Sequence, residues 1–462
     1  MTVLLAVAAL LGLVVWLQNL VFRRFGLRQL RYDCYLNRHE VFEGEELRLI
    51  EVVRNQKPLP LPWLKSELAT SPWLDFAGSK GIRTDRLRLV SSVFMLRGWH
   101  QLRREWQVRC RRFGWQGIEK VLLVSNDLLG NVTLSQPLPI QSWILVLPRP
   151  YDMEALPWEA RRLFGKLQVR RLFVPDPFFM EGVSEYSGLE PLRSIHWYAS
   201  AREQRLMVHR LRDSQDQSVA VLLNLEPRRS LTRFERSPLE YADAIRLAAT
   251  AFDQTLASGV PVELITNSLP EPLPQGLDPE ARQASDSGSA NPMIADILDE
   301  NLLPGLVRES LERGWYRSRR ASGRTHVYSL LRVLATLQNQ PTVPFATLLE
   351  ALENELVATD LIILSFYIDP VIEDFVKRQM AAGRRPRIGL LSSGEDEYTR
   401  RVSAGDLDGV VIPLYRVAHN LREAAIASGL TVEETGIPEV LGQQHKMGSG
   451  EGEEADDVAA AS

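Results

Sequence analysis

The sequence predicts a multidomain protein with an N-terminal transmembrane helix, an antiparallel β-sandwich-like domain and a doubly wound α/β domain. Residues 3–22 carry no charged side chain, and about 20 apolar residues suffice for a helix to cross a bilayer. Between residues 31 and 148, apolar and polar residues alternate with period two in short runs that turn residues separate. After residue 205, strand patterns alternate with helix patterns, which is typical of a parallel sheet covered on both faces.

The first element, residues 1–22, is expected to be an uncleaved transmembrane anchor that contacts the lipid bilayer through residues 3–22. A basic region before the apolar run and a small-residue cleavage site after it, the marks of a signal peptide, are both missing. Arg23, Arg24, Arg28 and Arg31 follow the run before any acidic residue. This charge bias predicts a single-pass protein of the cell membrane with the bulk of the chain cytoplasmic. The alternatives are a processed secretory signal and an extracytoplasmic envelope protein of reversed topology.

Residues 31–148 are expected to form the β-sandwich-like domain. A run such as Glu46-Leu-Arg-Leu-Ile-Glu-Val-Val alternates with period two, and Asn55-Gln-Lys-Pro supplies a turn after it. At least six such strands without an intervening helix favour a sandwich. Residues 149–204 are interpreted as a connector that includes the most distinctive segment of the chain.

Residues 205–430 are expected to form the α/β domain. The segment 218–225 is almost continuously apolar, as in a strand buried on both faces, and 239–257 has apolar residues at helical spacing. Strands follow at 260–266 and 360–367. The acidic tail, 442–462, has little to bury and is expected to be disordered.

Composition excludes several classes of protein. The 462 residues carry a formal net charge of −4, so no global positive field recruits nucleic acid. Cys34 and Cys110 are the only cysteines, which excludes a disulfide scaffold and a cysteine-rich zinc module.

The most distinctive segment runs from Gly182 to Arg202. It resembles the signature of the domain-of-unknown-function 58 family of bacterial membrane-anchored proteins, approximately Gly-x-Arg-Glu-Tyr-x-x-Gly-Asp-x-x-Arg-x-Ile-x-Trp-x-x-x-Ala-Arg. The positions in register are Gly182, Glu185, Tyr186, Arg193, Ile195, Trp197, Ala201 and Arg202. The chain departs from the pattern at Ser184 and Leu189, and Glu190 replaces the family's Asp.

The resemblance covers nearly the whole chain and implies an α/β domain similar to a von Willebrand factor A module. It also implies a non-catalytic scaffold. Relatives are commonly encoded beside MoxR-type AAA+ ATPases, so the implied partner is such an ATPase, in the assembly or maturation of another complex.

The signature residues are candidates for an interaction site. Glu190 followed by Pro191 is typical of a helix start, and from there Arg193, Trp197 and Ala201 fall one turn apart. We expect a buried polar clasp between the two domains, with Arg193 and Arg202 paired to Glu185 or Glu190 and Trp197 packed under the sheet. A surface for a ligand or partner is the alternative interpretation.

The first strand of the α/β domain indicates a degenerate metal site. Modules similar to von Willebrand factor A bind Mg²⁺ through Asp-x-Ser-x-Ser after this strand, because the ion prefers hard oxygen ligands. Here Asn224, Glu226 and Arg228 occupy those positions, and an arginine where an oxygen ligand belongs opposes the ion. We therefore expect no metal, with a rearranged site at Glu226 as the alternative.

Catalytic and cofactor motifs are missing from the sequence, including the phosphate loop, the nucleophile elbow and the His-Glu-x-x-His zinc motif. No enzyme activity and no cofactor are expected. The competing hypothesis is a hydrolase of unrecognised type with a site around Glu185, Arg193 and Arg202. The arginine-rich segment 317–324 is expected to be a solvated loop, with a patch for phosphate or an acidic partner as the alternative.

Overall fold

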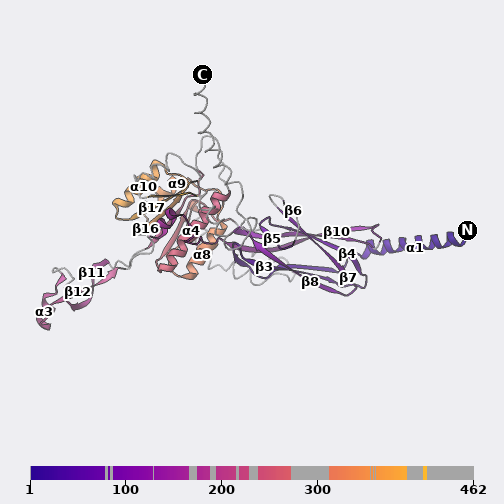
Figure 1. Ribbon diagram of the computed structural model, residues 1–462, viewed down its shortest axis with the longest axis horizontal. Helices are drawn as coiled ribbons and strands as arrows, with labels where there is room; N and C mark the ends of the chain where they lie inside the picture. The colour runs from indigo at the N-terminus through magenta and orange to yellow at the C-terminus, as the bar shows by residue number, and fades with distance from the viewer. Residues whose placement is uncertain are drawn as a thin grey trace, which may run out of the picture.

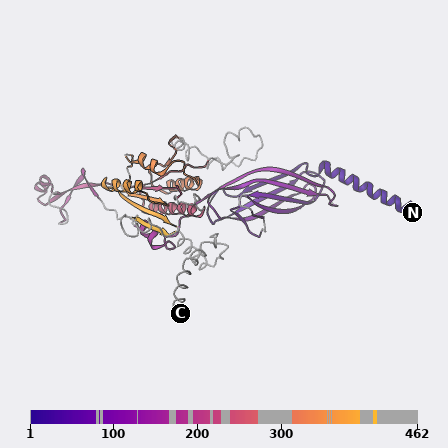
Figure 2. The ribbon, with the colours of Figure 1, turned by 90° about the horizontal axis from the view of Figure 1, so that it is seen from above.

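The computed structural model describes residues 2–78, 82–83, 87–127, 129–165, 174–187, 194–214, 218–227, 238–271, 312–353, 355–356, 358, 360–392 and 409–413. The predictions for Glu190, Arg193, Arg228 and the tail 442–462 lie outside these residues. Figures 1 and 2 show the parts in a row, with the N-terminal helix at one end, a β-rich domain next to it and an α/β domain beyond.

The N-terminal helix α1 (Thr2–Phe25) confirms the prediction of a helix long and apolar enough to cross a membrane. It extends past the predicted end at residue 22 to Phe25, and Phe22 is buried in the core of the β-rich domain. Gly26 follows directly, and a side chain there would meet Leu134 at 2.6 Å. The helix therefore continues into the β-rich domain without a loose linker.

The β-rich domain consists of two sheets around one core, which confirms the prediction for this part of the chain. One sheet has the order β1-β3-β8-β5 and the other β2-β10-β9-β4-β7-β6. Strand pairs are antiparallel except β2 with β10. The strands are β1 (Leu30–Leu36), β2 (Glu40–Phe42), β3 (Glu46–Asn55), β4 (Leu61–Thr70), β5 (Leu74–Phe76), β6 (Ile82–Arg83), β7 (Arg88–Leu96), β8 (Gln101–Cys110), β9 (Gly114–Asn126) and β10 (Thr133–Leu147).

The core of the sandwich contains a carboxylate. Glu51 on β3 is fully buried, because its side chain falls on the same face as Leu49 and Val53. It accepts hydrogen bonds from Tyr32 on β1, Trp106 Nε1 on β8 at 2.6 Å, and the hydroxyls of Ser66 on β4 and Ser92 on β7 at 3.0 and 2.9 Å. The two serines belong to the opposite sheet, so one carboxylate joins both layers of the sandwich.

The α/β domain is built on a six-stranded sheet of order β15-β14-β13-β16-β17-β18, parallel except for β15. The strands are β13 (Val219–Leu223), β14 (Val262–Thr266), β15 (Tyr316–Arg317), β16 (Asp360–Ser365), β17 (Arg385–Ser392) and β18 (Gly409–Pro413). The helices are α2 (Trp158–Gly165), α4 (Pro238–Ser258), α8 (Arg324–Thr336), α9 (Phe345–Leu352) and α10 (Pro370–Ala381).

Both faces of this sheet are covered by helices. Val221 and Leu223 on β13 share a core with α2, α4 and α8, whereas Ala220 and Leu222 share another with α9 and α10. The continuous apolar run of β13 is therefore explained by burial on both sides. Helix α2 belongs to this domain, so the interpretation of its residues as part of a connector is wrong.

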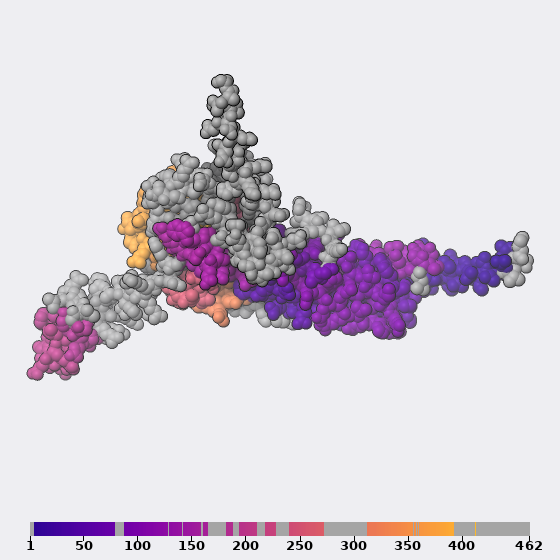
Figure 3. All heavy atoms as spheres, viewed as in Figure 1, coloured from indigo at the N-terminus to yellow at the C-terminus, as the bar shows by residue number. Residues whose placement is uncertain are grey.

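A third part is a small arm formed by β11 (Val174–Glu185), α3 (Trp197–Glu203) and β12 (Met207–Ser214). Strand β12 pairs antiparallel with β11 and not with the α/β sheet, which begins at Val219. The predicted start of the α/β domain at residue 205 is therefore too early. In Figures 1 and 2 the arm projects from the α/β domain at the end of the molecule opposite α1, and Figure 3 shows it as a separate lobe.

The interface between the sandwich and the α/β domain is held by partly buried ion pairs. Arg246 on α4 donates to Glu43, which follows β2, through Nε at 2.9 Å and Nη2 at 2.8 Å. Arg332 on α8 donates through Nη2 to Glu40 on β2 at 2.9 Å. The clasp between the domains therefore lies here, and the prediction that the signature segment supplies it is not supported by the described residues.

Candidate interaction site

The described residues of the signature segment lie on the arm. Gly182, Glu185 and Tyr186 fall at or next to the end of β11, Ile195 pairs with Val208 just before α3, and Trp197, Ala201 and Arg202 lie on α3. The hairpin register explains this arrangement, because Glu185 pairs with Met207, shortly after α3. The signature is thus a local unit in which a strand end and a short helix fold back on one another.

Helix α3 is fixed to β12 by polar contacts. His196 caps the helix, and its Nδ1 accepts a hydrogen bond from the Ala199 amide at 3.1 Å. The His196 amide donates to the Met207 carbonyl at 2.7 Å, and Ser200 Oγ accepts from the Met207 amide at 2.8 Å. The ring of His196 lies 4.4 Å from that of His209 on β12. These contacts place the short helix in one orientation on the hairpin.

The orientation leaves two large aromatic side chains in solvent. Trp197 is 70% exposed and Tyr198 is 78% exposed, whereas Ile195 and Val208 are buried between the helix and the hairpin. The prediction that Trp197 packs under the sheet is therefore wrong. Helix α3 begins only at Trp197, after the cap His196, and not near Glu190 and Pro191 as predicted. Its buried residue is Ser200, so the predicted face of Trp197 and Ala201 is the exposed one. Val183 and Leu206 on the same arm are also exposed.

The predicted ion pairs of the signature are also different in the structure. Glu185 contacts Arg205, with 3.2 Å between Oε2 and Nη1, and both side chains are more than half exposed. Arg202 is exposed on α3. An exposed ion pair contributes at most about 1 kcal/mol to stability, so this contact does not hold the arm in place.

A second polar cluster lies at the carboxyl ends of the central strands of the α/β sheet. Asn224 follows β13, and its Nδ2 donates to Ser365 Oγ, at the end of β16, at 2.9 Å. Asn267 follows β14 and donates through Nδ2 to Asn224 Oδ1 at 3.1 Å. In doubly wound sheets this edge, where the strand order reverses between β13 and β16, is the usual location of a binding site.

Glu226, the candidate ligand of a rearranged metal site, is occupied by donors of the chain. Its Oε2 accepts the Phe345 amide at the start of α9 at 3.1 Å and the Tyr367 hydroxyl at 2.8 Å. Burial, and then the hydrogen bond to Glu226, raise the pKa of Tyr367 above its usual range. Within the described ranges, no three His, Cys, Asp or Glu side chains gather as metal ligands. Glu226 thus links the loop after β13 to the start of α9 and to the loop after β16.

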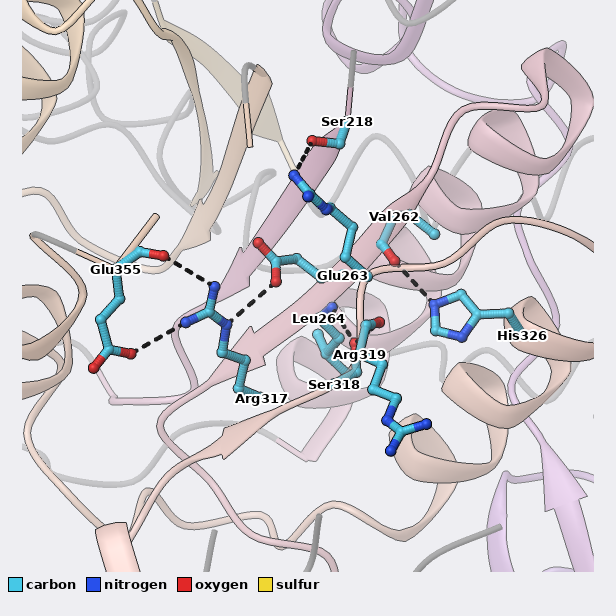
Figure 4. A network of polar contacts seen from close by, with 10 residues as sticks. Ser218, Val262, Glu263, Leu264, Arg317, Ser318, Arg319, His326 and Glu355 are labelled. Atoms are coloured by element: carbon cyan, nitrogen blue, oxygen red, sulfur yellow. Dashed lines mark hydrogen bonds and ion pairs between the residues drawn. The ribbon is translucent and has the colours of Figure 1, made fainter. Parts of the chain in front are cut away.

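The arginine-rich segment is partly structured, so the expectation of a solvated loop is wrong for its first residues. Arg317 on β15 donates through Nε to Glu263 on β14 at 3.2 Å and through Nη1 to Glu355 at 3.2 Å (Figure 4). Arg320 donates to Ser218 Oγ at 3.2 Å. These cations fix the edge strand to its neighbours.

Four residues of these sites were not predicted from the sequence: Tyr198, Asn267, Ser365 and Tyr367. A signal for the last three was present, because each follows or ends an apolar strand whose carboxyl end meets the others at one edge of a parallel sheet. Tyr198 gave no such signal, since its exposure depends on what α3 packs against.

Comparisons with known proteins give no assignment. No family model matches the chain, and no curated protein matches it. Among solved structures, a non-cellulosomal cohesin from Archaeoglobus fulgidus is 11% identical over 24% of this chain and 92% of its own, with a TM-score of 0.17. The sporulation control protein Spo0M from Bacillus subtilis is 12% identical over 30% of this chain and 56% of its own, with a TM-score of 0.16. No function follows from similarities of this size.

Proposed function

We propose that the protein is a membrane-anchored, non-catalytic interaction scaffold whose arm binds a partner protein. The observation that carries this proposal is the exposure of Trp197 and Tyr198 on a projecting hairpin. Aromatic side chains dominate the binding energy of protein interfaces, because they bury a large area at a small entropic cost. Exposed Val183 and Leu206 add apolar surface to the same arm.

The small size of the arm supports a partner. A two-stranded hairpin is marginally stable by itself in water, and among the described residues the helix that packs on it is the seven-residue α3. A partner that covers Trp197 and Tyr198 would supply the missing burial and stabilise the hairpin. In Figure 1 the arm lies far from α1, which favours a protein partner beyond the membrane surface over the bilayer itself.

The anchor belongs to the proposal. We infer that α1 spans the cell membrane once and that the bulk of the chain is cytoplasmic, because Arg23 and Arg24 form its last turn. A C-terminal alkaline phosphatase fusion should be inactive in cells and a fluorescent protein fusion should be bright. The opposite pair of results would place the chain on the other side of the membrane.

The identity of the partner rests on the resemblance to the domain-of-unknown-function 58 family, which implies a MoxR-type AAA+ ATPase. The strand order β15-β14-β13-β16-β17-β18, with helices on both faces, supports an α/β domain similar to a von Willebrand factor A module. The hydrolase hypothesis is less favoured, because it needs Glu185 in an enclosed site and this side chain is 63% exposed.

The test is a crosslinking pull-down from native membranes that compares the intact protein with the double variant Trp197→Ala/Tyr198→Ala. The matched control is Trp158→Ala, which removes an aromatic side chain that is 61% exposed on α2. We expect the intact protein and the control to recover an AAA+ ATPase. The amount recovered by the double variant should be lower by about tenfold or more. Equal recovery by the folded double variant would refute binding through the arm.

A further inference from the structure

A basic pocket lies where α1 meets the sandwich. It has a volume of about 1230 Å³ and is lined by the end of α1, the loop 57–60 and the first residues of β10. Its cationic residues are Arg23, Arg24, Arg28 and Lys57, and none of its described lining residues is acidic. Leu30, Leu59 and Leu134 add an apolar part to the lining. The pocket therefore offers positive charge and apolar surface side by side.

Lys57 is the unusual member of this pocket. The residue is only 3% exposed, yet its Nζ has no hydrogen-bond partner among the described residues. Burial lowers the pKa of Lys57 to about 8, because the ammonium loses hydration and gains no counter-charge. A buried cation without a partner is costly, so an anion that enters the pocket would satisfy it.

The surroundings of the pocket indicate where such an anion comes from. Arg23 and Arg24 are in the last turn of the helix that is apolar enough to cross a membrane. The neighbouring turn holds Trp99, which is 70% exposed and donates its amide to the Lys57 carbonyl at 3.0 Å. Tryptophan is enriched at the level of lipid headgroups, and clustered cations next to a membrane helix attract anionic lipids.

We propose that this pocket binds the phosphate-bearing headgroup of an anionic phospholipid, with Lys57 and Arg28 contacting the phosphate and the leucines contacting the upper part of the acyl chains. The proposal rests on the membrane anchoring proposed above. It adds a specific lipid ligand, which would fix the orientation of the sandwich on the bilayer because Phe22 is already buried in its core.

The test uses the full chain in mixed micelles that contain phosphatidylglycerol or phosphatidylcholine, with bound lipid counted by native mass spectrometry. We expect the wild-type protein to retain phosphatidylglycerol preferentially. Lys57→Gln should reduce this retention about fivefold or more, the effect of about 1 kcal/mol per basic residue. The control Lys377→Gln removes an exposed lysine from α10 and should retain the lipid fully.

Thermal unfolding of the variants separates a loss of lipid binding from a loss of folding, and carbonate extraction tests the membrane anchor by itself. Because the Lys57 Nζ has no hydrogen-bond partner among the described residues, Lys57→Gln should keep at least the thermal stability of the lipid-free wild-type protein. If Lys57→Gln does not fold, Arg28→Gln is used in its place, and it should reduce the retention of phosphatidylglycerol in the same way. Equal retention of both lipids, unchanged retention in the folded variants, or displacement by millimolar inorganic phosphate would overturn the proposal. Carbonate extraction of native membranes tests the anchor independently, because lipid retention in micelles does not require insertion.

Discussion

Arg246 on helix α4 forms a bidentate ion pair with Glu43 in the sandwich, with 2.9 Å from Nε to Oε2 and 2.8 Å from Nη2 to Oε1. The side chains are 23% and 10% exposed, and Arg246 also contacts Asp243 at 2.8 Å. Tyr151 donates its hydroxyl to the same Asp243. One arginine thus connects both domains and the segment that joins them, so the sandwich transmits the orientation of α1 to the α/β domain.

Removing the acidic partner of this arginine should weaken the whole molecule. We expect Glu43→Ala to lower the free energy of unfolding by about 3 kcal/mol, the low end for breaking a buried ion pair, because Arg246 loses its main partner but keeps Asp243. The measurement is denaturant unfolding in detergent. The control Glu46→Ala breaks an exposed pair with Arg109 and should cost less than about 1 kcal/mol. Similar losses in the two variants would show that the interface does not depend on Glu43.

The buried carboxylate of the sandwich should be essential for the stability of that domain. Glu51→Ala removes the acceptor of Tyr32 and Trp106, and it leaves Ser66 and Ser92 to hydrogen-bond only to each other. Because each unsatisfied buried donor costs about 1–3 kcal/mol, we expect a loss of at least about 3 kcal/mol, measured by thermal unfolding. Glu119→Ala, at an exposed position on β9, is the control and should change stability little. A loss below about 1 kcal/mol for Glu51→Ala would contradict the network.

The contribution of Asp75 to the stability of the sandwich should be lost at acidic pH. Burial alone would raise the pKa of this carboxyl, but hydrogen bonds from Arg88 at 2.6 Å and Arg111 at 3.0 Å outweigh burial and lower the pKa below 3.8. Because the pKa is lower in the folded state than in the unfolded state, ionised Asp75 stabilises the fold above about pH 4. This stabilisation is lost as the pH falls through the folded-state pKa.

We therefore expect Asp75→Asn to destabilise the protein by about 1–2 kcal/mol at pH 7, a modest value because the side chain is 31% exposed. The difference from wild type should shrink as acid protonates Asp75. Asp33→Asn, on β1 of the same domain, is the control, since Asp33 has no ion-pair partner in the described part of the chain. A difference for Asp75→Asn that is constant from pH 7 to pH 3 would refute the assigned role.

The Tyr367 hydroxyl should stabilise the loops at the carboxyl edge of the sheet. Tyr367→Phe removes the 2.8 Å hydrogen bond to Glu226 and leaves this acceptor only partly satisfied. We expect a loss of about 1–2 kcal/mol in the free energy of unfolding. The control Tyr198→Phe removes a hydroxyl from an exposed residue and should have no effect. If both variants have the same free energy of unfolding as the wild type, the hydrogen bond between Tyr367 and Glu226 does not stabilise these loops.

Local patterns predicted much of the fold. Alternation with period two identified β3, and the apolar runs identified α1, β13 and β16, because these patterns follow from which face of an element is buried. The start of the α/β domain was predicted at residue 205, because a local pattern does not reveal which strand another strand pairs with. The first strand after that residue, β12, pairs with β11 and not with the α/β sheet.

Contacts between distant residues could not be predicted. Glu43 and Arg246 are 203 positions apart, and Glu40 and Arg332 are 292 apart, so no spacing rule relates them. The prediction therefore placed the clasp in the signature segment, which is the most distinctive stretch of the sequence. The exposure of Trp197 was missed for a similar reason, because helical spacing defines a face but does not say what covers it.

The most direct test of the scaffold account is photocrosslinking in native membranes with a photoreactive phenylalanine analogue at position 198, compared with one at position 158. The account predicts a crosslinked adduct with an AAA+ ATPase from position 198 and none from position 158, since both residues are exposed but only Tyr198 lies on the arm. Adducts of equal yield from both positions, or no protein adduct from position 198, would contradict it.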